Sequence, residues 1–265
     1  MTPSEIGPAA RALAHGECQA IADAFERTPE VHEAVHRARK TIRRLRALLA
    51  LLESSALVTA AADAALRRLG DGLSALRDAH VVVETCERLA SAQPDQPWEA
   101  VCIRLTARRE AVLARVLARD PAFARRQAAL LRIVTDLQAQ PWDSLRGGDI
   151  RKGLARSERR TQKAEKRATR SHDADDLHRW RRRVRRLRMQ LEALPQLAPS
   201  RSVPIKGPGQ SKHARALHAL SDQLGWQQDL RMVRNLVRVM PGVPERRALI
   251  EQIDADMRDR RLIQT

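Results

Sequence analysis

Apolar residues recur at three- and four-residue spacing along almost the whole chain, a pattern typical of helices that bury one face. Prolines and glycines interrupt this pattern at intervals of about 20 to 30 residues, as helix boundaries do. Phe and Trp make up 2% of the sequence and Tyr is absent, although β-sheets draw on aromatic residues. We therefore predict an all-α protein, with helices over residues 8–27, 30–53, 56–90, 97–119, 121–139, 148–170, 173–194, 210–240 and 244–262.

The charge of the chain is strongly one-sided. Its 49 Lys and Arg residues face 32 Asp and Glu residues, which gives a formal net charge of +17. A polyanionic partner is the first expectation for such a chain. Most of the cations are arginines, whose planar donors match phosphate oxygens in pairs.

The sequence lacks the patterns of a membrane span, a signal peptide and a cysteine-based metal or redox motif. No apolar stretch reaches the roughly 20 residues of a membrane span, and residues 1 to 20 lack a signal-peptide pattern. A cytoplasmic protein without a membrane partner is therefore expected. Cys18, Cys86 and Cys102 lack the short spacing of a zinc or redox motif, so buried free thiols are expected.

One eleven-residue pattern occurs twice. Residues 36–46 read HRARKTIRRLR and residues 178–188 read HRWRRRVRRLR, and eight positions are identical or exchange Lys for Arg. On a helix, each copy places apolar residues on one side and a dense cationic stripe on the other. The predicted anion-binding stripes are His36, Arg39, Lys40, Arg43 and Arg46 in the first copy, and His178, Arg181, Arg182, Arg185 and Arg188 in the second.

Neither copy contains an acidic residue. Like charges three or four residues apart destabilise a helix by a few tenths of a kcal/mol per pair. A solvated helix face usually interleaves acids to avoid this repulsion, so an external anion is the expected compensator. Lys212 and Arg215, on the helix that follows the second copy, are weaker candidates for the same site.

A fainter correspondence follows each copy. LSALRDAHVV at residues 73–82 resembles LGWQQDLRMV at residues 224–233, which aligns Asp78 with Asp229 and Arg77 with Gln228. We therefore predict an internal duplication. A first helical half, residues 1–140, and a second, residues 141–265, would form pseudo-symmetric bundles with the basic helices facing each other across a cleft.

These doubled motifs resemble the CHAD domain, the conserved histidine α-helical domain. The resemblance covers most of residues 10 to 262 and implies one domain over residues 1–265, in which two helical bundles flank a basic cleft. It also implies binding of inorganic polyphosphate without catalysis or a cofactor, in the cytoplasm and on polyphosphate granules.

Two other functions compete with this interpretation. Nucleic acid offers the same phosphate charge, but single-strand binders need aromatic platforms that this chain scarcely has. HEAVH at residues 32–36 matches the zinc-protease pattern HExxH, with His32 and His36 as ligands and Glu33 as base. Cations share that helix face and the second copy lacks the first His and the Glu, so we predict no metal site and no enzymatic activity.

Overall fold

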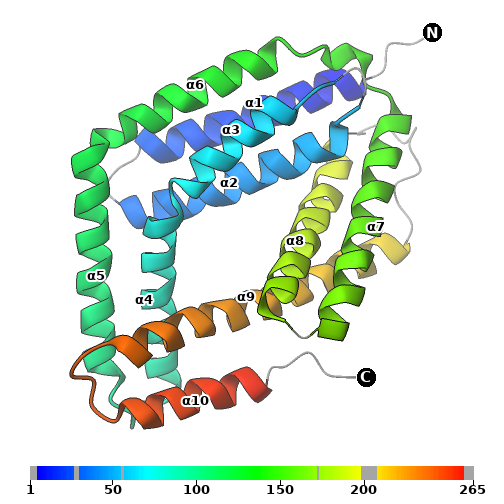
Figure 1. The fold of residues 1–265 in the computed structure, drawn as a ribbon. Helices are drawn as coiled ribbons and strands as arrows, with labels where there is room; N and C mark the ends of the chain where they lie inside the picture. The colour runs from blue at the N-terminus through cyan, green and yellow to red at the C-terminus, as the bar shows by residue number, and fades with distance from the viewer. Residues whose placement is uncertain (1–4, 27–29, 55–56, 172, 198–207, 260–265) are drawn as a thin grey trace. The chain divides into compact units, whose positions relative to one another are not determined.

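A computed structural model describes residues 5–26, 30–54, 57–171, 173–197 and 208–259. Every regular secondary-structure element in these residues is a helix, which confirms the predicted fold class (Figure 1). The α-helices are α1 (Ile6–Glu26), α2 (Val31–Leu52), α3 (Ala60–Asp71), α4 (Ser74–Ala92), α5 (Trp98–Arg119), α6 (Ala124–Gln138), α7 (Gly147–Ser171), α8 (Ala174–Leu197), α9 (Pro208–Val239) and α10 (Arg246–Asp259). Two single turns of 3-10 helix, Pro121–Phe123 and Trp142–Ser144, flank α6.

One predicted helix was wrong, because the stretch 56–90 forms two helices. The helix breaks at Gly72 and Leu73, between α3 and α4. Two arginines from other helices hold the carbonyls that the break leaves without helical partners: Arg39 donates to the Gly70 oxygen, and Arg126 donates to the Gly72 oxygen at 2.8 Å. Apolar periodicity runs through this break, so periodicity alone could not show it.

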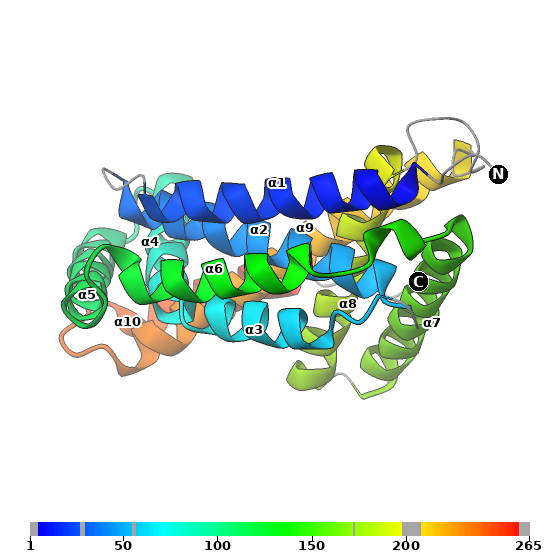
Figure 2. The same ribbon diagram turned by 90° about the horizontal axis from the view of Figure 1, so that it is seen from above.

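The chain divides into two compact units, and each contains segments from both halves of the sequence. Unit 1 holds residues 1–73 and 122–221, and unit 2 holds residues 74–121 and 222–265. In unit 1, α1, α2, α3 and α6 lie side by side as a four-helix bundle (Figure 2). Helices α7 and α8 form a hairpin that packs on α2. The division into halves at residue 140 describes the sequence repeat and stays a prediction.

Two close contacts fix the hairpin against α2. A Cβ atom built on Gly153 of α7 would lie 1.9 Å from the carbonyl oxygen of Leu51, so only glycine permits this approach. Gln190 of α8 is fully buried and donates from Nε2 to the Ala47 oxygen at 3.0 Å. Helices α2 and α8, which carry the two copies of the motif, therefore pack directly on each other.

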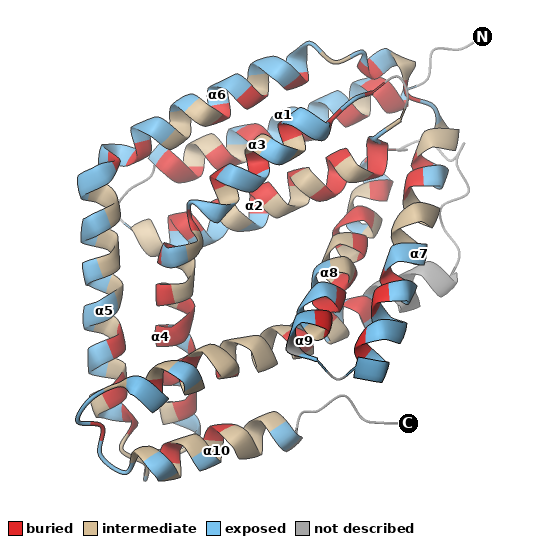
Figure 3. Cartoon of the chain, in the orientation of Figure 1, coloured by how far each residue is buried: buried red, intermediate tan, exposed pale blue. Residues whose placement is uncertain are grey.

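Unit 2 has its own apolar core, formed by α4, α5, α10 and the part of α9 after Ser221. Val83, Trp98, Leu230 and Leu249 are among its most buried residues. Figure 3 shows the buried residues as stripes along the helices, as amphipathic helices require.

The expectation of three free thiols was wrong for two of them. Cys86 of α4 and Cys102 of α5 form a disulfide in the unit 2 core, with Cα atoms 5.8 Å apart. Their separation of 16 residues spans a helix hairpin, so spacing alone gave no sign of the pairing. Cys18 is a buried free thiol as expected, and burial raises its pKa to about 11.

None of the helices in the described residues combines the length and the apolarity needed to span a membrane.

Candidate anion-binding site

Helix α2 buries the apolar side of the first motif. Val35, Ala38, Ile42 and Leu45 are at most 2% exposed, which confirms that side as a core face. On the opposite side His36 and Lys40 are exposed, while Arg39, Arg43 and Arg46 are half-buried.

The half-buried arginines of α2 are held by protein groups. Arg46 forms a two-pronged ion pair with Asp63 of α3, at 2.8 Å from Nε and 3.1 Å from Nη2. Arg39 donates to the Gly70 oxygen, and Arg43 donates from Nε to the Arg39 oxygen at 3.0 Å. These three predicted binding residues therefore stabilise unit 1 as well.

Other acids compensate the remaining guanidinium groups of α2. Arg44 donates from Nε to both carboxylate oxygens of Glu17 on α1, at 2.9 Å. Arg37 pairs with Glu33 one turn earlier, at 3.2 Å. Much of the repulsion expected in the first copy is thus relieved inside the protein, by acids outside the eleven-residue motif.

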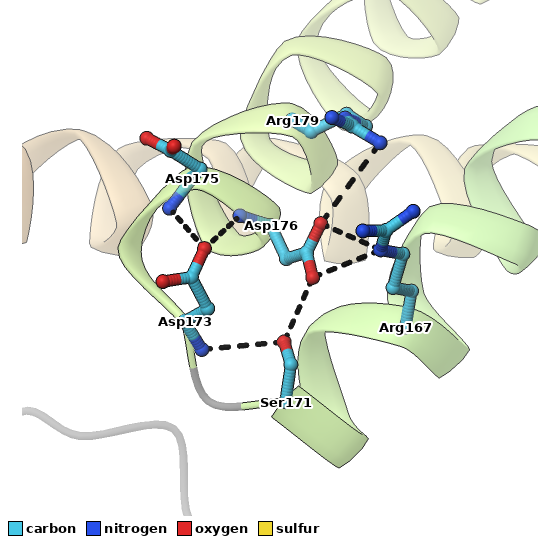
Figure 4. A network of polar contacts seen from close by, with 6 residues as sticks. All are labelled: Arg167, Ser171, Asp173, Asp175, Asp176 and Arg179. Atoms are coloured by element: carbon cyan, nitrogen blue, oxygen red, sulfur yellow. Dashed lines mark hydrogen bonds and ion pairs between the residues drawn. The ribbon is translucent and has the colours of Figure 1, made fainter.

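The second motif begins one turn inside α8, and a polar network anchors that turn (Figure 4). Asp173 is the N-cap, because its Oδ2 accepts from the backbone N–H groups of Asp175 at 2.9 Å and Asp176 at 3.3 Å. Asp176 is buried and accepts from Arg167 and Ser171 of α7, both at 2.9 Å. The hydrogen bond from Arg167 is the largest cause that lowers the pKa of Asp176.

The predicted stripe of α8 is only partly accessible. His178 and Arg182 are exposed and Arg185 is half-buried, whereas Arg181 is only 5% exposed. The Arg188 guanidinium lies 3.6 Å from Glu192 and contacts His218 of α9. Arg181 and Arg188 border the apolar side of the helix, which explains why they are covered.

Two further cations, Arg183 and Arg186, lie beside Arg182 on the opposite flank of α8. We call Arg182, Arg183 and Arg186 the α8 cluster; within the described part of the chain, none of the three makes an ion pair or a side-chain hydrogen bond. Burial and the positive charges of Arg160 and Arg182 lower the pKa of Arg183. The neighbouring positive charges add to this effect of burial, since like charges disfavour the protonated guanidinium.

The α8 cluster lies where the two copies meet. Burial is the main cause that lowers the pKa of Arg186; Asp63 raises that pKa, and Arg46 of α2 lowers it. The Asp63 carboxylate is already bound by Arg46, so one acid serves cations from both motif helices. Sequence reasoning missed Arg183 and Arg186 because it placed the binding stripe on the other flank of the helix.

The remaining predicted residues are Lys212 and Arg215 on α9 and His178 on α8. Arg215 is exposed on α9, and the side chain of Lys212 lies outside the part that the structure describes. Partial burial and, to a smaller extent, the charges of Arg181, Arg182 and Arg185 lower the pKa of His178.

Asp78 and Asp229, the aligned acids of the fainter repeat, share one cation in unit 2. Arg77 donates from Nη1 to Asp78 at 2.8 Å, and its Nη2 lies 3.6 Å from Asp229. The second copy has Gln228 at the position of Arg77, and a single arginine reaches both acids. We interpret these acids as structural residues that brace a basic side chain.

The HEAVH segment, residues 32–36, lies on α2, where its acid is engaged by an arginine. Glu33 is ion-paired with Arg37. Among the described residues, no three His, Cys, Asp or Glu side chains are grouped to hold a metal ion.

Comparisons with known proteins agree with this architecture. A crystal structure of the CHAD domain from the plant Ricinus communis is similar, with a TM-score of 0.63 and 21% sequence identity over 96% of this chain and 86% of that chain. No curated protein matches the chain. The family model described as CHAD domain matches residues 10–238, and the chain therefore belongs to the CHAD domain family.

Proposed function

We propose that this protein binds inorganic polyphosphate without turning it over, at a basic cleft formed by α2 and α8. The observation that carries the proposal is the α8 cluster, three arginines that form no ion pair or side-chain hydrogen bond among the described residues. A polyphosphate chain supplies a repeating line of anionic oxygens, which guanidinium groups bind through charge-assisted hydrogen bonds.

The contributions of the two motif helices differ in this proposal. The α8 cluster supplies the strongest contacts because none of its arginines is held in an ion pair within the described residues. Lys40 and His36 of α2 and His178 of α8 are exposed and extend the site, while Arg185 lines it partly buried. Arg39, Arg46, Arg181 and Arg188 mainly hold the helices and raise the local positive potential.

Nucleic acid is the rival ligand, and the aromatic residues argue against single strands. All six aromatic residues of the chain lie in the described part. Five are buried, and Trp226 of unit 2 is half-buried with the Arg88 guanidinium 4.2 Å from its ring centre. Single-strand binders stack bases on exposed aromatic rings. Duplex DNA, bound through its backbone alone, is the form that the experiment must separate from polyphosphate.

Calorimetric titration across a salt series tests the proposal. Long-chain polyphosphate should bind more tightly than duplex DNA of matched total charge, and its affinity should fall steeply with salt as counterions are released. No orthophosphate should appear during prolonged incubation. Equal affinity for the duplex would favour nucleic acid, and released orthophosphate would show an enzyme.

The site of action follows from the ligand. We propose that the protein associates with polyphosphate granules in the cytoplasm. A tagged copy should colocalise with a polyphosphate stain and disperse when polyphosphate is depleted. A distribution that depletion does not change would contradict granule association.

A further inference from the structure

Helix α7 carries a second cationic surface that neither copy of the motif contains. A groove of about 720 Å³ runs along α7 and the first turn of α8. Its cations are Arg159, Lys163, Lys166, Arg167 and Arg170.

Four of these cations form one straight stripe. At 100° per residue, Arg159, Lys163, Lys166 and Arg170 fall within an arc of about 60°, over a length of roughly 16 Å. All four are exposed, and none has an ion-pair or side-chain hydrogen-bond partner within the described ranges. Neighbours three or four residues apart on such a stripe repel each other.

The acids near this stripe do not neutralise it. Glu158 and Glu165 of α7 lie on a different face of the helix. Asp176 borders the groove but is buried, and its carboxylate accepts hydrogen bonds from Arg167 and Ser171 (Figure 4). These bonds hold the wall of the groove in place and leave the four exposed cations without a counter-charge.

The stripe is not a general property of the repeat. Helix α1 precedes α2 as α7 precedes α8, yet α1 carries a single arginine, Arg11, with the acids Glu17, Asp23 and Glu26. Helix α1 is covered by α6. Phe25 of α1 packs on Phe123, in the 3-10 turn before α6, with ring centres 5.6 Å apart. Helix α7 packs on α8 and α2 and presents its stripe to solvent.

We propose that the α7 groove is a second subsite for a condensed phosphate chain, which extends the α8 cluster and makes affinity depend on chain length. This inference rests on the proposed function. Helices α7 and α8 pack on each other as a hairpin, which brings the two surfaces into one unit. Arg160, next to the stripe in sequence, also lies close enough to Arg183 to contribute to the lowering of its pKa, after the larger effect of burial. A chain held at the α8 cluster would engage the groove at a high effective concentration, provided that it is long enough.

The test compares two ligands and two variants of equal charge. The groove variant changes Arg159, Lys163, Lys166 and Arg170 to Gln. The control variant changes Arg68, Arg108, Arg119 and Arg132 to Gln, which are exposed arginines of other helices. Tripolyphosphate and long-chain polyphosphate are titrated into each variant and the parent, and circular dichroism checks that helicity is retained.

We expect the groove variant to bind long-chain polyphosphate on the order of tenfold more weakly than the control variant, with tripolyphosphate affinity within about twofold. Equal long-chain affinity in the two variants would overturn the inference. Equal losses for both chain lengths would also overturn it, because the groove would then not act as an extension. A parent that binds neither ligand would instead overturn the proposed function itself.

Discussion

The two motif helices have nearly the same sequence but different electrostatic surroundings. Arg44 of α2 and Arg186 of α8 occupy equivalent positions. Arg44 is bound at 2.9 Å by Glu17, whereas no ion pair reaches Arg186 from the described residues. Thr41 of the first copy is buried, and its counterpart Arg183 belongs to the α8 cluster.

Equivalent cations in the two copies of the motif therefore need not have the same role. Acids on α1 and α3, outside the repeated pattern, determine which copy keeps charge for an external ligand. The first copy mainly stabilises unit 1, and the second keeps three arginines that form no ion pair among the described residues.

The largest effect is expected from removing the α8 cluster. Changing Arg182, Arg183 and Arg186 to Gln should weaken polyphosphate binding on the order of 100-fold, because each charge-assisted contact contributes about 1.5–3 kcal/mol. The salt dependence should become shallower by about one unit of slope for each lost contact. Calorimetry at several salt concentrations measures both quantities.

The matched variant removes three cations from α2. Changing Arg37, Lys40 and Arg44 to Gln takes away the same charge, and we expect a loss of less than about tenfold. Two of these side chains are already paired with acids. Similar losses in the two triple variants would refute the contrast between the helices.

A smaller effect, of opposite sign, is expected from Asp63. Changing Asp63 to Asn removes the acid that binds Arg46 and lies near Arg186, so polyphosphate affinity should rise roughly three- to tenfold. Asp71→Asn on the same helix is the control, because Asp71 makes an exposed pair with Arg67. If both variants bind polyphosphate with the affinity of the parent, Asp63 does not reduce the affinity of the site.

His178 should give the site a modest pH dependence. Its pKa is lowered from 6.5 by partial burial and by neighbouring arginines, and a bound polyanion should raise it again. Affinity for long chains should therefore increase about two- to fivefold as the pH falls from 7.5 to 6, and His178→Gln should lose that increment. Parallel pH profiles in parent and variant would exclude His178 as the source.

The same residue predicts a stability change of definite sign. The unfolded chain protonates His178 near its ordinary pKa, while the folded chain protonates it only at lower pH. His178 therefore lowers the free energy of unfolding as the pH falls below about 6.5. Thermal unfolding of parent and His178→Gln at pH 7.5 and 5.5 measures this loss without any ligand.

The smallest effect on binding is expected from Arg77 in unit 2. Arg77→Gln leaves Asp78 and Asp229 without their shared cation and should destabilise the protein by about 1–3 kcal/mol. Polyphosphate affinity should not change. Arg77→Lys, which keeps the charge, should recover part of the stability, and denaturant unfolding provides the measurement.

Much of the fold could be predicted because each helix repeats a simple pattern. Val35, Ala38, Ile42 and Leu45 recur at helical spacing and are buried, and Asp173 caps α8 as its position before an acidic first turn suggests. The α3–α4 break was missed because the apolar pattern continues through it. The Cys86–Cys102 pair was missed because helix packing, and not sequence spacing, brings the two residues together.

The candidate site could be predicted at the level of the helix but not of the residue. A helical wheel shows which side of α8 is apolar, yet it does not show which flank a neighbouring helix covers. Arg181, at one edge of the apolar side, is buried, whereas Arg186 on the opposite flank is half-buried and has a lowered pKa. Two of the acids that neutralise α2, Glu17 and Asp63, come from other helices, so no motif within α2 reveals them.

A crystal structure with a short polyphosphate bound would test the central claim most directly. We predict phosphate oxygens within hydrogen-bond distance of the guanidinium groups of Arg182, Arg183 and Arg186, with Arg44 still paired to Glu17. A phosphate chain ordered elsewhere on the protein, with the α8 cluster unoccupied, would contradict the account.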